Sequence, residues 1–302
     1  MSEFILATRG SELARVQARM VCDGLVAAWP GLTVREEIIR TTGDRHPDEE
    51  LAVLGGSGVF TKELEKAVLE GRAHAAVHSL KDLPVELPPG LVLGAILPRG
   101  NPDDVLVGAQ PGGVDGLPSG ARIGTGSPRR AAMIRALRND VEVWPVRGNV
   151  PTRVRQVADG RCSAVILAAA GLERLGWPAE GPWQIEGRTL FASTLHSFLP
   201  APGQGAIAVE IRGDDEETLR RVSVLHDPQT SAAVTAERAV LRALGGGCHL
   251  ALGARGSVQN GTLVLEAVFF GADGKSSKTA RASGSAREPD KIGFSAAEQL
   301  RS

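Results

Sequence analysis

Short apolar runs alternate, over the first two thirds of the chain, with segments in which apolar residues recur at helical spacing. The run 4–7 predicts a buried strand, and Leu13, Val16 and Met20 then recur every three or four residues. Ser11 stands just before them and is typical of a residue that caps a helix. The same succession of strand, turn and helix start is repeated further along. This alternation favours an α/β fold.

The alternation falls into two halves. In the first half, helical spacing begins near Thr61 and the run 75–77 predicts a strand. The second half follows a stretch rich in glycine and proline from 98 to 120, which has the composition of a boundary. Its predicted strands are 122–124, 141–144 and 164–167. A Gly-Arg pair precedes a strand in each half, at 71–72 and 160–161, so we expect two similar lobes facing one cleft.

The last third of the chain has a different pattern. After about residue 217, apolar positions from Ala233 to Leu244 predict a helix, and strand-like runs follow, separated by Asn260-Gly261 and Asp273-Gly274. Such dipeptides between apolar runs are strong signals of a β-hairpin. We therefore expect a small α+β domain here.

Length and charge restrict the class of protein. With 302 residues the chain exceeds the size at which one core usually stops growing, so two or three domains are expected. Basic and acidic side chains nearly balance, at 34 and 35 residues, whereas nucleic-acid and membrane-surface binders favour a basic excess. We expect neither a nucleic acid nor a membrane as partner.

The cysteines and the N-terminal segment indicate a cytoplasmic protein. Cys22, Cys162 and Cys248 lie far apart and form neither the even framework of a secreted mini-protein nor a paired zinc spacing. The N-terminal segment lacks the pattern of a signal peptide, and no stretch reaches the roughly 18 apolar residues of a membrane span. A reducing cytosol fits best.

Metal and nucleotide sites are not predicted. The six histidines lack paired ligand spacing, and we interpret His78, at a predicted strand end, as a hydrogen-bonded scaffold residue. The glycine-rich segment 55–58 is not the dinucleotide fingerprint, and the chain lacks the full P-loop spacing.

Arginine-rich turns follow several of the predicted strands. In the segment 125–130, an anion would meet free backbone N–H groups, a hydroxyl, the positive end of a helix dipole and two guanidinium groups. The alternative is an ordinary capped helix with solvated arginines. Arg9, Arg147 and Arg153 repeat the arrangement at three other predicted strand-to-helix turns. If these turns converge, their ligand carries several anionic groups.

Cys248 follows three consecutive glycines, Gly245, Gly246 and Gly247. Glycine tolerates positive φ and has no Cβ to clash, so this segment suits an attachment point for a bulky ligand. Two alternatives stay open: Cys248 is a small buried hydrophobe after a helix end, or it is a thiol nucleophile, for which adjacent His249 is poorly placed.

Asp82 is the best candidate for an acid or base. It follows Lys81 just beyond a predicted strand end, where open α/β sheets place their ligands. Cationic neighbours would favour the ionised carboxylate, which suits stabilisation of a developing positive charge. The alternative is a helix N-cap.

Six motifs in register resemble the porphobilinogen deaminase family, also called hydroxymethylbilane synthases. They cover nearly the whole chain in the family's order, which makes the resemblance far more specific than any one motif. The matching segments are 6–11, 76–84, 124–130, 147–153, 202–206 and 246–248.

The resemblance implies two lobes like those of a type II periplasmic binding protein plus a small α+β C-terminal domain. The corresponding ranges are 1–98 with 195–213 for domain 1, 99–194 for domain 2 and 217–302 for domain 3. It also implies a dipyrromethane cofactor in thioether linkage to Cys248, and a monomeric transferase. The enzyme would join four porphobilinogen molecules head to tail and release hydroxymethylbilane and ammonia.

Roles for the residues follow from the same resemblance. Asp82 would be catalytic, stabilising the positive azafulvene that forms when ammonia leaves. The expected cofactor-binding residues are Lys81, Thr125, Ser127, Arg129 and Arg130. The expected substrate-binding residues are Arg9, Ser11, Gln17, Arg147, Arg153 and Arg174.

The sequence departs from the family pattern in places. Val53 and Ser57 replace lysines that many members have, Gly126 replaces a common serine, and Pro128 replaces an aliphatic residue. Glu12 stands where proline is frequent, and we expect its charge to weaken the hold of Arg9 on a carboxylate.

Two competing classes are a solute receptor or sensor domain without catalysis and a cysteine-dependent acyl-transfer enzyme. A receptor has no use for a cysteine on a glycine arm. An acyl-transfer enzyme needs a distant histidine to activate Cys248.

Overall fold

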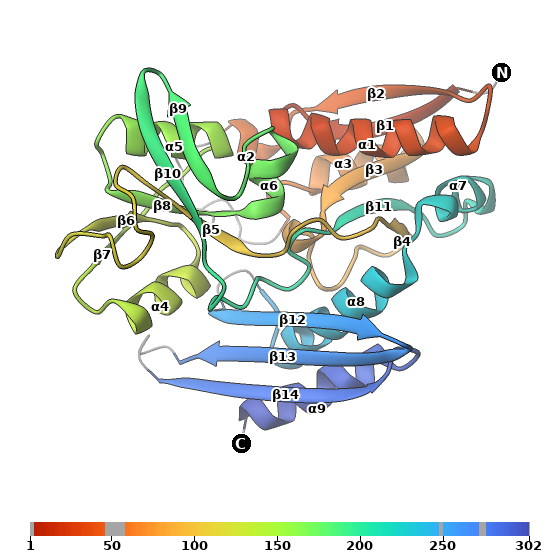
Figure 1. Cartoon of the computed structure of the whole chain (residues 1–302). Coiled ribbons are helices and arrows are strands. Elements are labelled where there is room, and N and C mark those ends of the chain that lie inside the picture. Colours follow the sequence, from red (N-terminus) through yellow and green to blue (C-terminus); the bar gives the residue numbers. More distant parts are fainter. Residues whose placement is uncertain (1–2, 46–57, 248–249, 272–275, 302) are drawn as a thin grey trace.

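The computed structural model describes residues 3–45, 58–247, 250–271 and 276–301. In this part of the chain the strands form three separate sheets. Figure 1 shows two α/β lobes beside each other and a smaller sheet with its helices below them. This is the fold class that the sequence predicts.

The first lobe contains a sheet with the spatial order β2 (Thr33–Ile39), β1 (Glu3–Arg9), β3 (Ala75–Ser79), β11 (Ile207–Arg212) and β4 (Leu91–Ile96). Its helices are α1 (Glu12–Ala28), α2 (Thr42–Arg45), α3 (Lys62–Leu69), α7 (Glu216–Val222) and the 3₁₀ turns η1 (Leu80–Asp82) and η2 (Ser223–Leu225). β1 is parallel to β3, so Arg9 and Ser79 end their strands at the same edge of the sheet.

Alternation of side chains along β1 explains how the helices cover this sheet. Phe4 and Leu6 point to one face and pack with α1, while Ala7 points to the other and packs with α3. β11 runs antiparallel to β3 and β4 and returns the chain to this lobe from the second.

The second lobe contains a sheet with the order β7 (Glu142–Trp144), β6 (Arg122–Gly124), β8 (Ala164–Ala168), β5 (Asp104–Gly108), β10 (Arg188–Thr194) and β9 (Gly181–Ile185). Its helices are α4 (Pro128–Leu137), α5 (Val150–Ala158) and α6 (Ala169–Arg174).

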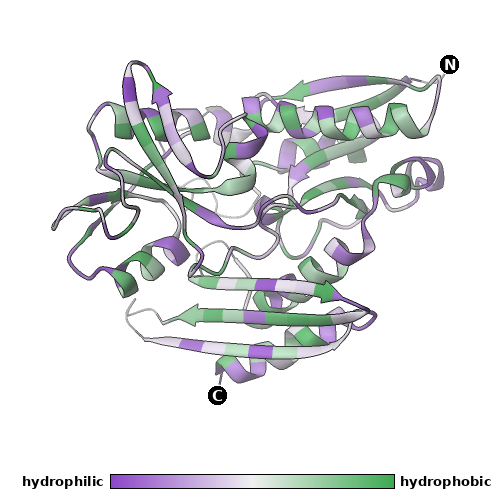
Figure 2. Cartoon of the chain, viewed as in Figure 1, coloured by the Kyte–Doolittle hydropathy of each residue, from purple (hydrophilic) through white to green (hydrophobic). Residues whose placement is uncertain are grey.

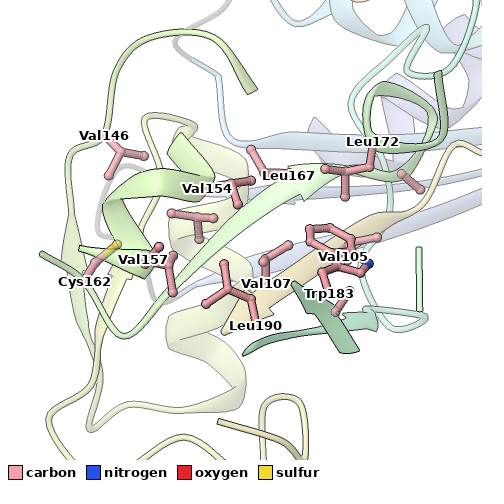
Figure 3. Close-up of a cluster of buried hydrophobic side chains, with 14 residues drawn as sticks. Val105, Val107, Val146, Val154, Val157, Cys162, Leu167, Leu172, Trp183 and Leu190 are labelled. Carbon is pink, nitrogen blue, oxygen red and sulfur yellow. The ribbon is translucent and has the colours of Figure 1, made fainter. Parts of the chain in front are cut away.

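One core of the second lobe lies between its sheet and α5. Val105 and Val107 from β5 and Val154 and Val157 from α5 are fully or almost fully buried in it, and Figure 3 shows these side chains gathered with Cys162 at one end. Burial raises the pKa of Cys162 to about 11, so this thiol is a core residue.

The third domain is a three-stranded antiparallel sheet of β12 (Leu252–Gln259), β13 (Thr262–Phe270) and β14 (Ser277–Ser285). Helices α8 (Pro228–Ala243) and α9 (Pro289–Arg301) contribute to a core with this sheet. Figure 2 shows that β13, the central strand, is mostly hydrophobic, whereas the edge strand β14 is mixed. Val268 and Phe270 belong instead to a core of the second lobe, so the sheet packs on both faces.

Most local elements form where the pattern predicts them. Ser11 caps α1 by accepting a hydrogen bond from the N–H of Ala14 at 3.3 Å, and Ser127 caps α4 with Pro128 at its first position. Asn260-Gly261 makes the turn between β12 and β13 with both φ angles positive. Asp82 lies in η1, so the N-cap alternative is wrong. The expected turn at Asp273-Gly274 lies outside the described residues.

None of the helices in the described ranges has both the length and the apolarity needed to cross a bilayer.

The residue ranges of the three domains given by the resemblance stay a proposal, under which each sheet lies in a domain of its own.

Candidate functional site

The turn after β3 carries Lys81 and Asp82. Leu80 is fully buried and its N–H donates to the carbonyl of Ala206 at 3.0 Å, while Leu83 is buried on the other side. These two leucines anchor the turn, in which Lys81 is half-buried and Asp82 is exposed. Gln17 of α1 exchanges hydrogen bonds with Ser79 at 2.8 and 3.1 Å, which ties the end of β3 to α1.

Arg129 and Arg130 lie in the first turn of α4 and are both almost fully buried. Each binds Asp104, the first residue of β5, whose side chain is completely buried; the shortest contacts are 2.6 Å from Arg129 and 2.7 Å from Arg130. Burial by itself would raise the pKa of Asp104, but the two guanidinium groups hold it far below its usual range. Sequence reasoning missed Asp104, although an acidic residue opening a strand of apolar residues is a usable signal.

The cations of the second lobe face the turn of the first. Burial and the charge of Arg130 lower the pKa of Lys81 to about 8, while Asp82 and Asp104 act in the opposite direction. Burial, Arg130 and Arg147 likewise lower the pKa of Arg153 to about 10, and Asp82 again opposes them. Lys81, Asp82, Arg129, Arg130, Arg147 and Arg153 therefore form one cluster of groups within electrostatic range of one another along the chain of pairs Lys81–Arg129, Lys81–Arg130, Arg130–Arg153 and Arg153–Arg147.

Gln204 joins the two sides of this cluster. Its Oε1 lies 3.4 Å from Nζ of Lys81 and 3.4 Å from Nη2 of Arg130, and its Nε2 donates to Asp104 at 2.9 Å. The backbone of Gln204 belongs to the chain that returns from the second lobe to the first. Its amide thus links the turn after β3 with the first turn of α4.

Several donors in the cluster have no hydrogen-bond partner, or have unused hydrogen-bonding capacity, in the described part of the chain. Nε of Arg129 is buried without a hydrogen-bond partner among the described residues, and Arg153 donates from Nε only to the carbonyl of Gly148 at 2.8 Å. The hydroxyl oxygens of Thr125 and Ser127 accept local N–H bonds and keep their own protons to donate. A ligand with several carboxylates fits this set of donors.

Two expected substrate-binding arginines have other contacts in the structure. Arg9 is held by Asp44 at 2.5 Å and lies over the ring of Phe60, 4.1 Å from its centroid. The carboxylate that binds Arg9 is Asp44, and the expected effect of Glu12 on Arg9 stays a prediction. Arg174 donates to the carbonyl of Gly205 at 2.7 Å, at the crossing between the lobes.

The glycine arm that leads to Cys248 lies against the turn after β3. Gly245, Gly246 and Gly247 all have positive φ angles, 97°, 59° and 130°, a run that side chains would strain. A Cβ on Gly246 would lie 3.9 Å from a methyl group of Val85. Cys248 itself lies outside the described residues, so its sulfur is not placed here. The glycine-rich segment 55–58 is likewise described only from Gly58 onward.

In the described part of the chain, no group of three or more histidine, cysteine, aspartate or glutamate side chains is arranged to hold a metal ion.

Fold and site together define a two-lobed α/β protein that gathers cations from both lobes around two carboxylates, Asp82 and Asp104. Residues 4–220 match the family model "Porphobilinogen deaminase, dipyromethane cofactor binding domain", and residues 231–302 match "Porphobilinogen deaminase, C-terminal domain". The chain therefore belongs to the porphobilinogen deaminase family. It is an enzyme of tetrapyrrole biosynthesis whose cofactor is a dipyrromethane.

Curated relatives agree over nearly the full length. The porphobilinogen deaminase of Syntrophobacter fumaroxidans is 45% identical over 288 residues, which cover 95% of this chain and 91% of the relative. That of Moorella thermoacetica is 45% identical over 300 residues, covering 99% and 93%. Among solved structures, the periplasmic VFT2 domain of Bordetella pertussis BvgS is similar at 15% identity and a TM-score of 0.45, covering 74% of this chain and 86% of that one.

Proposed function

We propose that this protein deaminates porphobilinogen and joins four molecules head to tail on a dipyrromethane primer bound by a thioether to Cys248, releasing hydroxymethylbilane and ammonia. One observation carries the proposal: Lys81 of the first lobe and arginines of the second gather around Asp82 and Asp104, beside the glycine arm that leads to Cys248. Porphobilinogen and the primer carry acetate and propionate groups, whose negative charge is opposite to that of these cations.

The residues nearest the buried Asp104 are proposed to hold the cofactor. Lys81 and the first turn of α4 present ammonium, guanidinium, hydroxyl and backbone N–H donors on one side of the cluster. The residues in this role are Lys81, Thr125, Ser127, Arg129 and Arg130. When bound, the dipyrromethane supplies the free pyrrole α-carbon to which the first substrate is joined.

Incoming substrate is proposed to meet the remaining donors. Arg153 of the second lobe lies within electrostatic range of Asp82 and of Arg147, and Arg9 and Gln17 lie at the edge where β1 and β3 end. Arg9 exchanges Asp44 for a substrate carboxylate in this role. The full set is Arg9, Ser11, Gln17, Arg147, Arg153 and Arg174.

Asp82 is proposed to stabilise the positive charge that develops on porphobilinogen as ammonia leaves. Its carboxylate is exposed at the turn and lies within electrostatic range of Lys81 and Arg153. Stabilising a charge that is present only in the transition state is commonly the largest catalytic term.

We further propose that the protein works as a monomer in the reducing cytoplasm, with no nucleic acid or membrane partner. The spacing of the cysteines and the balanced charge support this.

Incubation of the purified protein with porphobilinogen tests the function directly. We expect about four ammonia molecules per linear tetrapyrrole, measured by an enzymatic ammonia assay and by mass spectrometry of the product. Binding of porphobilinogen without release of ammonia would instead support a receptor, and ammonia without a tetrapyrrole would contradict chain assembly.

Lys81 is expected to limit the stability of the protein that lacks its cofactor. Its folded pKa of about 8 lies below the ordinary value of 10.5, so between these pH values the unfolded chain binds more protons. The destabilising contribution is therefore complete below pH 8 and disappears as the pH rises towards 10.5. In a Cys248→Ser background, Lys81→Met should raise the melting temperature at pH 7 by about 2 °C, a gain that shrinks at pH 10. A gain that is equal at both pH values would contradict this account.

A further inference from the structure

Helix α8 of the third domain reaches the turn that carries Asp82 through one side chain. Arg238 is 8% exposed, and its guanidinium donates to four backbone carbonyls of that turn. Nη2 lies 2.6 Å from the carbonyl oxygen of Pro84 and 3.1 Å from that of Val85. Nη1 lies 3.3 Å from the carbonyl oxygen of Leu83 and 3.5 Å from that of Leu80.

This guanidinium is buried without an ion pair to a carboxylate among the described residues. Burial and the charge of Arg242 lower its pKa to about 10, and Glu86 acts in the opposite direction. A buried charge is costly unless its donors are satisfied, and here backbone carbonyls satisfy them. The position is therefore built to hold that backbone.

The four carbonyls lie on both sides of Lys81 and Asp82 in the sequence. Fixing the carbonyl of Leu80 before them, and those of Leu83 to Val85 after them, restricts the backbone of the two residues between. The same helix adds an apolar contact, since Val234 packs in one cluster with Leu80 and Leu83. Side chains of α8 thus hold the turn both at its backbone carbonyls and at its buried leucines.

From this geometry we infer that Arg238 is a positioning residue that holds Asp82 where charge develops in the reaction. The inference rests on the proposed function, in which Asp82 is catalytic. α8 also ends in the glycine arm beside Val85. One helix therefore determines the position of both the attachment arm and the catalytic turn. Through Arg238 the third domain contributes to catalysis without a contact to the substrate.

Arg238→Lys tests the inference with the least disturbance, because lysine keeps the charge and up to three donors but loses the planar fork. We expect kcat per cofactor-bearing molecule to fall at least tenfold, since small misplacements of a catalytic group cost up to about 100-fold. KM and the covalent adduct seen by intact mass should change little.

Arg242→Lys is the matched control. Arg242 lies one turn later on α8 and pairs with Glu86 at 2.9 Å and Asp290 at 3.2 Å, at a partly exposed position. This variant should keep the kcat of the original protein. An unchanged kcat in Arg238→Lys, or an equal fall in both variants, would overturn the inference.

A double-mutant cycle separates positioning from general stability. If Arg238 acts through Asp82, Arg238→Lys should lower kcat little further in an Asp82→Asn background. Additive losses would mean that Arg238 acts independently of Asp82, and the inference would be wrong. A normal kcat in Asp82→Asn alone would instead refute the proposed role of Asp82, and with it the function from which the inference starts.

Discussion

Cys248→Ser is expected to remove the covalently bound dipyrrole and to lower activity by about 10³-fold or more. When several groups act as one catalytic unit, removing one of them costs nearly as much activity as removing all of them. A thiol ionises far more readily than a hydroxyl and is the better nucleophile for attachment. Intact mass of the purified proteins gives the result. The original protein should carry the mass of a dipyrrole, and the variant should have the mass of its polypeptide alone.

The other cysteines provide the control for this experiment. Cys22 is half-buried and Cys162 is buried in the core of the second lobe, and burial raises the pKa of each to about 11. Cys22→Ser and Cys162→Ala should therefore keep the adduct. Active original protein with the bare polypeptide mass, or an adduct that survives in Cys248→Ser, would rule out attachment at this residue.

Asp82→Asn is expected to lower kcat by about 10²- to 10³-fold, equivalent to about 3–4 kcal/mol of transition-state stabilisation. The amide has nearly the same shape as the carboxylate, so the change removes the negative charge and leaves the exposed turn intact. Steady-state kinetics should show the loss in kcat, and intact mass should show whether the cofactor is still attached.

Asp140→Asn is the control for Asp82→Asn. Asp140 pairs with Arg138 at 2.7 Å at the far end of α4, outside the cationic cluster, and its replacement should leave kcat unchanged. Equal rates for Asp82→Asn and the original protein at saturating porphobilinogen would show that the Asp82 charge is not used in the reaction.

The sequence alone predicted the local elements well. Ser11 and Ser127 were recognisable as caps because their hydroxyls satisfy N–H groups at helix starts. Asn260-Gly261 was recognisable as a hairpin turn because both residues tolerate positive φ. These signals depend on neighbours within a few residues, so they can be recognised from the sequence without the tertiary structure.

The candidate site could be predicted only in part from the sequence. Lys81, Asp82 and the arginines were predicted from their places after strands and from the resemblance to the family. Asp104, Gln204 and Arg238 were missed, although Gln204 stands inside a matching motif and Arg238 inside a predicted helix. Their partners lie 25 to more than 150 residues away along the chain, so no local pattern reveals them.

By itself, then, the sequence determined the two α/β halves, the separate C-terminal domain, the glycine arm before Cys248 and the excess of arginine in its turns. The tertiary structure alone decided which charges meet. Arg129 and Arg130 share Asp104 because β5 and α4 pack together, and Arg238 holds the turn of Asp82 because α8 packs across the first lobe. The chemical nature of each side chain can be read from the sequence at that position, whereas the pairing of buried charges depends on contacts between segments that are distant in the sequence.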